Sequence, residues 1–385
     1  MLSTDGLRTW AEVDYDAIEH NVREIEKLMG STKIMGIVKA DAYGHGAAAA
    51  ARALKKAGVD YFAVACLQEA VDLRSAGITE PILVLGYTPP VDFHVLEMLD
   101  LDQTIVNRDY AEKMNEWAKK NQTALKAHVK LDTGMNRTGI LYQDGAKNLE
   151  DLLEVYRLPN LKIEGIFSHF PVSDDLAENQ VDFTRHQMEL FDEAVKEIRA
   201  AGLNPGLRHI QNSYGILNYQ DCGYDYCRPG LLYMGVTSDD AVDTLSHPDF
   251  IPILSLKTKV SMTKTIPAGA SVSYGRHYTV DKPSRIASLC IGYADGLPRI
   301  CSNQDLQVLI RGHLVPVVGN ICMDQCMADI TGFDDIQEGD TAIVIGQEDG
   351  TQLTVDRISR LAHTINNETL TRITARVPRI DIHQE

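Results

Sequence analysis

The sequence predicts an α/β fold: a (β/α)8 TIM barrel followed by a mostly β C-terminal domain. The chain has 385 residues, more than one ordinary hydrophobic core needs. From Met35 to Gly230, short apolar or β-branched runs alternate with helical patterns, which is typical of βα units around a parallel sheet. After about Thr237 the chain changes to Val, Ile and Thr runs separated by turn residues. We therefore expect a barrel at residues 10–240 and a β domain at 241–385, joined by residues 1–9.

The barrel prediction depends on a count of eight strands. The candidate strands are Met35–Val38, Tyr61–Ala65, Ile82–Leu85, Gln103–Val106, Ala127–Leu131, Ile163–Phe167, Leu207–Gln211 and Tyr226–Arg228. Between them, apolar residues recur at three and four in the candidate helices Ala47–Ala57, Leu67–Ser75, Tyr110–Lys119, Leu149–Tyr156 and Phe183–Ala201. Eight strands with intervening helices predict a closed barrel.

Two further segments are assigned to the β domain. Thr9–Val13 alternates like a strand but has no place in the barrel count, so we expect it to pair with the C-terminal domain. Within that domain only Val355–Ile365 has a helical pattern.

Composition excludes several classes of partner. The formal net charge of −17 disfavours nucleic acid and anionic membranes. No apolar run approaches the ~20 residues of a membrane span, and the first residues lack a signal-peptide pattern. The seven cysteines include no paired C-x-x-C units of the kind that bind zinc. We expect a cytoplasmic protein with no metal site.

Polar residues follow the predicted barrel strands. In a TIM barrel the active site lies at the carboxyl ends of the strands. Those ends here carry Lys39, Lys130, His169, the pair Asn212–Ser213 and Arg228–Gly230. Each of these residues alone could be an ordinary solvated or loop-bonded side chain. Together they predict a pocket for a ligand that carries a phosphate and a carboxylate.

The motifs around these residues resemble those of the alanine racemase family over nearly the whole chain. The most specific is the run Val38 to Gly46, VKADAYGHG, which resembles the family's cofactor-lysine signature. Further matches are HVKLDTGMNR (128–137), SHF (168–170), SYG (273–275), GYADG (292–296) and CMDQ (322–325). The resemblance implies a barrel that binds pyridoxal 5'-phosphate, a following β domain and a homodimer.

The resemblance also implies a two-base mechanism with two catalytic residues, Lys39 and Tyr274. Removing a proton next to a carboxylate needs an electron sink, which the cofactor supplies. Lys39 would bind the cofactor covalently and act as the base on one face of the substrate. Tyr274 would act on the opposite face and come from the partner subunit. A tyrosine, with an ordinary pKa near ~10, needs nearby cations to act as a base, and we expect His169 and Arg228 to supply them.

The remaining site residues are assigned by the same resemblance. The expected cofactor-binding residues are Lys39, Tyr43, His169, Asn212, Ser213, Arg228, Gly230 and Leu231. Arg228 would donate to the pyridine nitrogen, and Tyr43, Ser213 and the N–H groups of Gly230 and Leu231 would hold the phosphate. The expected substrate-binding residues are Arg137, Met323, Tyr293 and Lys130, with Arg137 and the Met323 N–H on the substrate carboxylate. Lys130 matches a residue that is carbamylated in many members.

The sequence departs from the family pattern at three positions. Ala375 stands where most members have a tyrosine, and Asn320 and Leu314 stand where arginines are typical. A smaller residue at 375 predicts a roomier pocket. The serine racemases of vancomycin-resistance clusters also lack that tyrosine, and the segment GYADGLPR (292–299) resembles theirs.

We therefore expect an alanine racemase acting on a small amino acid, and several alternatives remain open. The first is a serine-preferring or broad-specificity racemase. A second, of another class, is a non-catalytic pyridoxal-phosphate-binding protein, which Tyr274 and the second domain argue against. A related barrel-plus-β decarboxylase is a third. A metal-dependent sugar-phosphate barrel is disfavoured because no Asp, Glu and His cluster follows the strands.

Overall fold

Eight parallel strands form a closed barrel in the computed structural model, which describes residues 6–220 and 222–383. Neighbouring strands pair in parallel around the ring, and pairing of β5 with β6 closes it. The strands are β2 (Lys33–Ile37), β3 (Tyr61–Val64), β4 (Ile82–Val84), β5 (Asp102–Ile105), β6 (Leu125–Asp132), β9 (Leu161–Phe167), β10 (Leu207–His209) and β11 (Tyr226–Cys227). The predicted TIM barrel with eight strands is confirmed.

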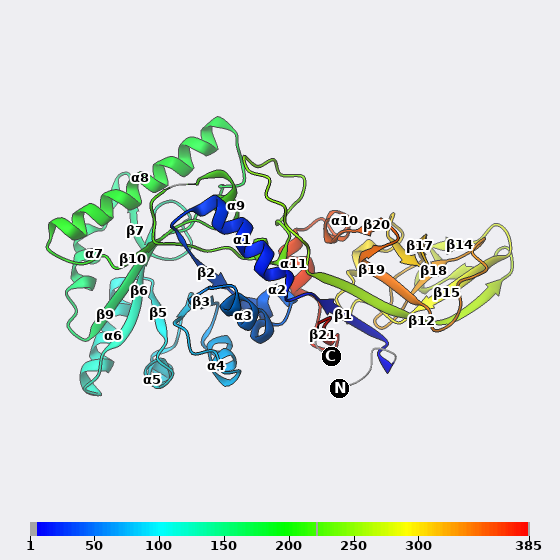
Figure 1. Ribbon diagram of the computed structural model, residues 1–385, viewed down its shortest axis with the longest axis horizontal. Helices are drawn as coiled ribbons and strands as arrows, with labels where there is room; N and C mark the ends of the chain where they lie inside the picture. The colour runs from blue at the N-terminus through cyan, green and yellow to red at the C-terminus, as the bar shows by residue number, and fades with distance from the viewer. Residues whose placement is uncertain (1–5, 221, 384–385) are drawn as a thin grey trace.

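Amphipathic helices cover the outside of this barrel (Figure 1). In α1 (Ala17–Met29) the residues Ile18, Val22, Ile25 and Met29 are buried, at the spacing of one helical face. The other barrel helices are α3 (Ala47–Lys56), α4 (Leu67–Ser75), α5 (Phe93–Met98), α6 (Arg108–Lys120), α7 (Leu149–Tyr156), α8 (Glu178–Ala200) and α9 (Ser213–Asn218). The long helix predicted from Phe183 begins five residues earlier, at Glu178. A small hairpin, β7 (Ile140–Gln143) and β8 (Ala146–Lys147), extends the sheet beyond β6.

The C-terminal domain is built around a second closed ring, this one antiparallel. Its strands are β12 (Leu254–Ile266), β15 (Ser284–Leu289), β18 (Cys326–Asp329), β17 (His313–Val318), β16 (Gln307–Ile310) and β19 (Thr341–Glu348), in spatial order, with β19 pairing back to β12. Four short strands lie outside the ring: β13 (Ser271–Val272), β14 (Tyr278–Thr279), β20 (Thr351–Leu353) and β21 (Arg379–Asp381). The mostly β second domain is confirmed.

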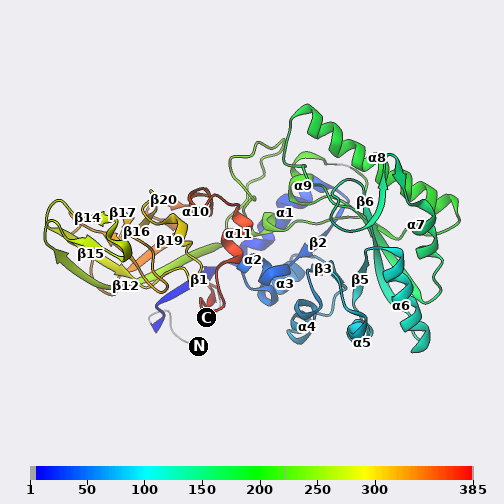
Figure 2. The same cartoon turned by 180° about the vertical axis from the view of Figure 1, so that it is seen from behind.

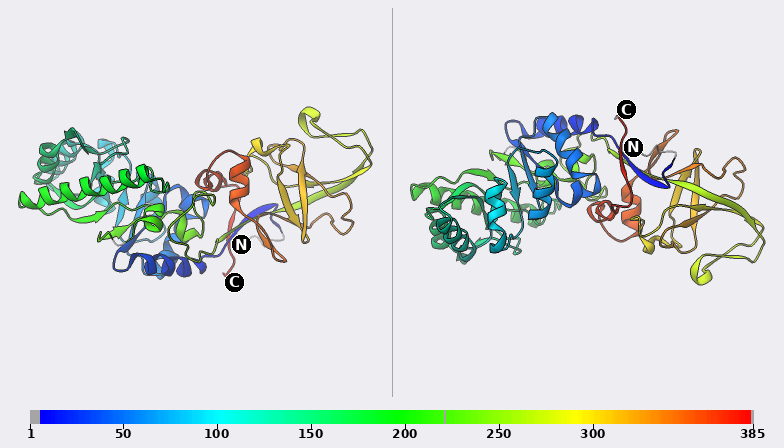
Figure 3. Two further views of the ribbon diagram at one scale, coloured as in Figure 1. Left: turned by 90° about the horizontal axis from the view of Figure 1, so that it is seen from above. Right: turned by 90° about the horizontal axis from the view of Figure 1, so that it is seen from below.

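The first strand of the chain belongs to the C-terminal sheet. β1 (Thr9–Val13) pairs antiparallel with β12 and parallel with β21, as predicted for this segment. The barrel and the β domain form the two ends of an elongated molecule, as Figure 2 shows from behind. In Figure 3 the blue β1 segment and the red C-terminal segment lie together at the junction between the two ends.

Two short helices of the C-terminal part lie next to this junction. α10 (Val355–Leu361) confirms the first part of the predicted helix, which ends four residues earlier than expected. A separate helix, α11 (Asn366–Thr371), was not predicted. It lies against α2 (Lys39–Gly44) of the barrel (Figure 1). α11 therefore brings C-terminal residues to the end of the barrel where Lys39 lies.

The segment α2 contains a left-handed turn. Ala40, Asp41, Ala42 and Tyr43 all have φ between 51° and 54°. This conformation costs L-residues roughly 1–2 kcal/mol each, so surrounding contacts must hold it. The carboxylate of Glu69 accepts from the Ala40 N–H at 2.7 Å, and the carboxylate of Asp41 accepts from the Ala47 N–H at 2.8 Å.

α11 and β21 also hold the turn. Arg379 donates to the Gly44 carbonyl at 2.8 Å. A Cβ on Gly44 would lie 2.2 Å from the Leu370 carbonyl oxygen, so only glycine allows α11 to approach this closely. The strained segment that follows β2 is thus fixed by both domains.

Among the described residues, no helix combines the length and the apolarity that crossing a membrane requires.

Candidate functional site

A cavity of about 530 Å3 opens at the carboxyl ends of the barrel strands. Four of its lining side chains are cationic, namely Lys39, Lys130, Arg137 and Arg228. Among the described residues that line it, none is an aspartate or a glutamate. The chain as a whole carries a formal charge of −17, so this concentration of cations runs against its average composition. The cavity is suited to an anionic ligand.

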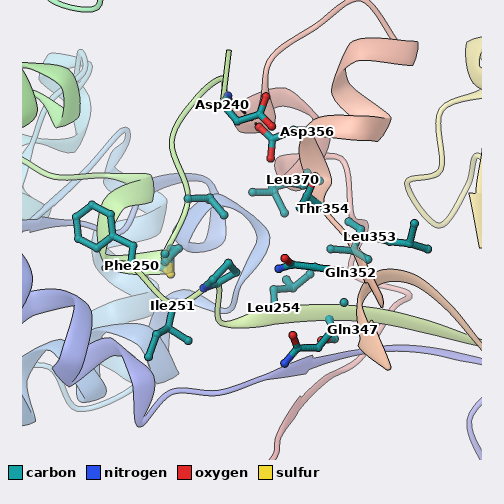
Figure 4. Close-up of a pocket in the computed structure, with 18 of the residues that line it drawn as sticks. Asp240, Phe250, Ile251, Leu254, Gln347, Gln352, Leu353, Thr354, Asp356 and Leu370 are labelled. Carbon is teal, nitrogen blue, oxygen red and sulfur yellow. Dashed lines mark hydrogen bonds between the residues drawn. The ribbon is translucent and has the colours of Figure 1, made fainter. Parts of the chain in front are cut away.

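A second cavity, of about 420 Å3, lies between the barrel and the β domain (Figure 4). Its walls are mostly apolar, with Phe250, Leu254 and Leu353 among them, and the carboxylates of Asp240 and Asp356 stand together at one end. No lysine or arginine is among the described residues around it. An anion would be repelled there, so the barrel cavity is the better candidate for the predicted site.

The two lysines of the barrel cavity have lowered pKa values. Burial, followed by the charge of Arg137, lowers the pKa of Lys39. The same two effects lower the pKa of Lys130 to about 8, and its ammonium group donates to the Thr138 hydroxyl at 2.9 Å. A lysine with a lowered pKa has more of its neutral, nucleophilic amine form at neutral pH.

Arg228 is held rigidly in the barrel interior. Its guanidinium group donates to the carbonyl oxygens of Ser168, His209 and Ile210 at 2.7–3.1 Å. It also contacts Nδ1 of His209 at 2.9 Å and Nδ1 of His169 at 3.2 Å. Five such contacts fix both the position and the orientation of this cation.

His169 does not carry the positive charge that the sequence analysis expected. Burial and the neighbouring Arg228 lower its pKa well below 6.5, so its ring is neutral at neutral pH. His169 and Arg228 were the two side chains expected to favour the phenolate form of Tyr274. Of these, only Arg228 remains as a cation.

A cradle of small and polar groups lies on another wall of the cavity. The Gly230 N–H donates to the Ser213 hydroxyl oxygen at 3.1 Å. A Cβ on Gly230 would lie 2.4 Å from the Tyr43 hydroxyl oxygen, so this tyrosine sits directly over the glycine. Asn212 caps α9 by accepting from the Gly215 N–H at 2.8 Å, which places the N-terminus of α9 at the cavity. Hydroxyl groups and a close backbone approach suit a phosphate.

Replacing Gly230 by alanine is expected to weaken binding of a phosphate-bearing cofactor by on the order of tenfold. The effect would come from the methyl group of alanine, which would displace Tyr43. The measurement is a cofactor titration followed by visible absorbance. Gly6→Ala is the control, because a Cβ there meets nothing within 4 Å. Equal affinities for the two variants would contradict the cradle.

Four predicted residues do not line this cavity within one chain. Leu231 packs in the hydrophobic core. Tyr274, Tyr293 and Met323 belong to the β domain and are 71%, 40% and 52% exposed. Tyr274 precedes β14, which lies at the end of the β domain remote from the barrel (Figure 1). A single chain therefore does not bring Tyr274 to Lys39.

Asn320, one of the departures from the family pattern, supports the Tyr274 segment. Its side-chain amide donates to the Tyr274 carbonyl at 2.7 Å, and its own carbonyl accepts from the Ser273 hydroxyl at 2.6 Å. Ser273 has φ 67°, so this segment also needs support from its neighbours. One contact holds the backbone carbonyl of Tyr274, and the other holds the side chain of the residue before it.

Several lining residues were missed by the sequence analysis. These are Tyr87, Tyr214, Ser238 and Asn367. They come from loops, from α9 and from α11, where no strand pattern points to the cavity. His209, which contacts Arg228, was also missed, although a histidine within a buried strand is itself a signal.

The fold and the cavity define a class of protein, a barrel with a rigid cationic site at its mouth. Such a site suits an anionic cofactor that reacts with an amine. Comparison with known sequences agrees with this class. Residues 13–238 match the alanine racemase N-terminal domain, and residues 253–381 match the alanine racemase C-terminal domain. The chain belongs to the alanine racemase family.

Individual relatives are similar over almost their whole length. "Alanine racemase 2" of Caldanaerobacter subterraneus is 42% identical, over 98% of this chain and 95% of the relative. The alanine racemase structure from Clostridium difficile has a TM-score of 0.91 at 34% identity, covering 100% of this chain and 98% of that one. The Bartonella henselae alanine racemase, solved with covalently bound pyridoxal phosphate, has a TM-score of 0.84 at 28% identity, covering 98% and 100%. None of the names of these three proteins mentions serine.

Proposed function

We propose that this protein is a pyridoxal-phosphate-dependent alanine racemase, an isomerase that interconverts L- and D-alanine. The observation that carries the proposal is the barrel cavity, where a half-buried lysine with a lowered pKa faces the same space as the cradle of Tyr43, Ser213 and Gly230. Membership of the alanine racemase family and the names of the relatives support the same substrate. The serine-preferring alternative has no support from them.

The residues of the cavity fit pyridoxal phosphate. The cradle of Tyr43, Ser213 and Gly230 suits its phosphate, and the fixed guanidinium of Arg228 suits its pyridine nitrogen. Lys39 is the residue that would bind it covalently, with His169, Asn212 and Leu231 completing the assigned set. When bound, this cofactor supplies the electron sink that stabilises the negative charge left after the α-proton of an amino acid is removed.

Lys39 and Tyr274 are proposed as the two bases. The lowered pKa of Lys39 makes its amine able to take a proton at neutral pH. Inversion requires that a second group delivers a proton to the opposite face of the same carbon. Tyr274 is exposed on the β domain and held by Asn320, so it is available to a site outside its own chain.

We therefore infer a homodimer in which each barrel receives Tyr274 from the partner chain. Tyr293 and Met323 would reach the same site, because they too are exposed on the β domain. Arg137 and the Met323 N–H would bind the substrate carboxylate. Lys130, with its pKa near 8, has the neutral amine form that carbamylation needs. The odd number of cysteines, seven, with no paired C-x-x-C units, suits a reducing compartment, and we propose that the enzyme works in the cytoplasm.

The test is racemisation of L-alanine by the purified protein loaded with pyridoxal phosphate. We expect L-alanine to reach an equal mixture of the two enantiomers, measured by optical activity or by a D-amino-acid-specific assay. L-serine under the same conditions should react more slowly. A loaded protein that leaves both amino acids unchanged, or that releases carbon dioxide instead, would overturn the proposal.

A further inference from the structure

Below Arg228, four buried side chains form a continuous series of hydrogen bonds through the interior of the barrel. We call this series the file. Nδ1 of His209 lies 2.9 Å from Nη1 of Arg228, and Nε2 of His209 lies 2.9 Å from Nδ1 of His128. Nε2 of His128 lies 2.8 Å from the hydroxyl oxygen of Tyr61. That hydroxyl donates to the carboxylate of Asp102. All four of these residues are at most 4% exposed.

The file spans the barrel from one end to the other. Asp102 and Tyr61 are the first residues of β5 and β3, while Arg228 follows β11 at the cavity. His128 and His209 lie between them, on β6 and β10. The five groups come from five different segments, so the file depends on closure of the barrel and not on local sequence.

The direction of every hydrogen bond in the file follows from its two ends. A protonated guanidinium can only donate, so Nδ1 of His209 accepts. Burial lowers the pKa of His128 to about 3 and that of His209 well below 6.5, so each ring is neutral with one N–H. His209 must then donate from Nε2 to His128, and His128 from Nε2 to Tyr61. The Tyr61 hydroxyl, having accepted, donates to Asp102, which is an acceptor when ionised.

We propose that His209, His128, Tyr61 and Asp102 form a one-directional hydrogen-bond relay that positions Arg228 and keeps it as a charged donor at the cofactor. We call these four residues the Arg228 relay. They touch neither cofactor nor substrate and are positioning residues. Asp102 is the distant counter-charge of Arg228. The inference rests on the proposed function only in taking Arg228 as a cofactor contact.

The charges around Arg228 give such a relay a stabilising role. Burial, with a smaller contribution from the charge of Arg137, lowers the pKa of Arg228 to about 9. The cavity itself offers no carboxylate among its described lining residues to offset these effects. A file of aligned dipoles that ends on an anion polarises each bond in turn and strengthens the final one to Arg228.

The relay ends at Asp102, whose carboxyl group changes its protonation state with pH. Burial raises the pKa of Asp102 to about 6, and one of its carboxylate oxygens is buried with no hydrogen-bond partner. The other titratable or charged groups that face Asp102 are Tyr61, Lys126, Glu164, Asp100, Arg74 and Lys162. As pH falls through about 6, Asp102 takes up a proton and Tyr61 loses its anionic acceptor.

The first test reads the histidine tautomers directly. Holoenzyme with 15N-labelled histidine is studied by NMR from pH 5 to 8. We expect His128 and His209 to stay neutral with the proton on Nε2, and the His128 signal to shift with a midpoint near pH 6 in the wild type but not in Asp102→Asn. A proton on Nδ1 of either ring would overturn the relay. So would a His128 signal whose pH dependence is the same in the wild type and in Asp102→Asn. Because the tautomers are read in the wild type, a variant that fails to fold does not block the test.

The second test asks whether the relay reaches the cofactor. Tyr61→Phe and Asp102→Asn should each lower kcat for alanine by on the order of tenfold, with KM little changed, and should shift the pH dependence of the cofactor's visible absorbance. The double variant should be no worse than either single one, because one file is broken in each case. The matched control is Tyr110→Phe, a tyrosine of equal burial that donates only to the Thr88 carbonyl.

The two tests separate the relay from the proposed function. An Asp102→Asn enzyme with the absorbance and kcat of the Tyr110→Phe control would contradict an effect on Arg228. If the tautomers are as expected but no alanine is racemised by the wild type, the proposed function fails while the hydrogen-bond file stands.

Discussion

Replacing Tyr274 by phenylalanine is expected to lower alanine racemisation by on the order of 10²–10⁴-fold, the usual effect of removing a general acid–base group. The change deletes only the hydroxyl group. The Asn320 amide that donates to the Tyr274 carbonyl, and the Ser273 hydroxyl that donates to the Asn320 carbonyl, are untouched, so the segment should keep its shape. Tyr274 of the same chain does not line the barrel cavity, where we propose that the cofactor binds, so cofactor absorbance should persist.

The measurement compares kcat for alanine and the visible absorption spectrum of Tyr274→Phe with those of Tyr278→Phe. Tyr278 lies four residues further on and donates to Asp329, so it controls for loss of a tyrosine hydroxyl in the same part of the domain. Wild-type turnover in Tyr274→Phe would remove this residue from the mechanism. Loss of the cofactor spectrum would instead make it a binding residue.

Replacing Lys39 by alanine should abolish covalent cofactor binding and lower racemisation by at least about 10³-fold, because one side chain both holds the cofactor and serves as a base. Peptide mass mapping after borohydride reduction of the holoenzyme should place the cofactor on Lys39 in the wild type. A small external amine should restore part of the activity of Lys39→Ala, since the missing group is an amine.

Lys33→Ala is the control for this substitution. Lys33 is an exposed lysine at the start of β2 that pairs with Asp60 at 2.6 Å, well before the strand end that carries Lys39. The assignment of Lys39 fails if the reduced cofactor is found on another lysine, such as Lys130, which lines the same cavity with a lowered pKa.

The sequence was sufficient to predict the architecture, because strands of the barrel are buried on both faces and therefore appear as short apolar runs. It was not sufficient for α11 or for the left-handed turn of α2. The sequence of α11, NNETLT, has no apolar periodicity, and its place is set by packing on Gly44. The turn is formed by Ala40 to Tyr43, and for L-residues of these types a left-handed helix is less favourable than a right-handed one.

The composition of the site was largely predictable, since the carboxyl ends of parallel strands meet at one edge. Lys39, Tyr43, Lys130, Arg137, His169, Asn212, Ser213, Arg228 and Gly230 all line the one barrel cavity. The charge state of His169 was not predictable, because it depends on burial beside Arg228. The Arg228 relay was missed for a similar reason: its members are single polar residues on four strands, and only the closed barrel aligns them.

Mixing two inactive variants tests the central claim, which is that each active site is completed by a second copy of the chain. Lys39→Ala and Tyr274→Phe chains, carrying different tags, are co-expressed and the mixed dimers are isolated. In a mixed dimer one site keeps both groups and the other loses both, so about half of the wild-type activity per dimer should return. Mixed dimers as inactive as the two parents would contradict the account, because Lys39 and Tyr274 would then have to act from the same chain.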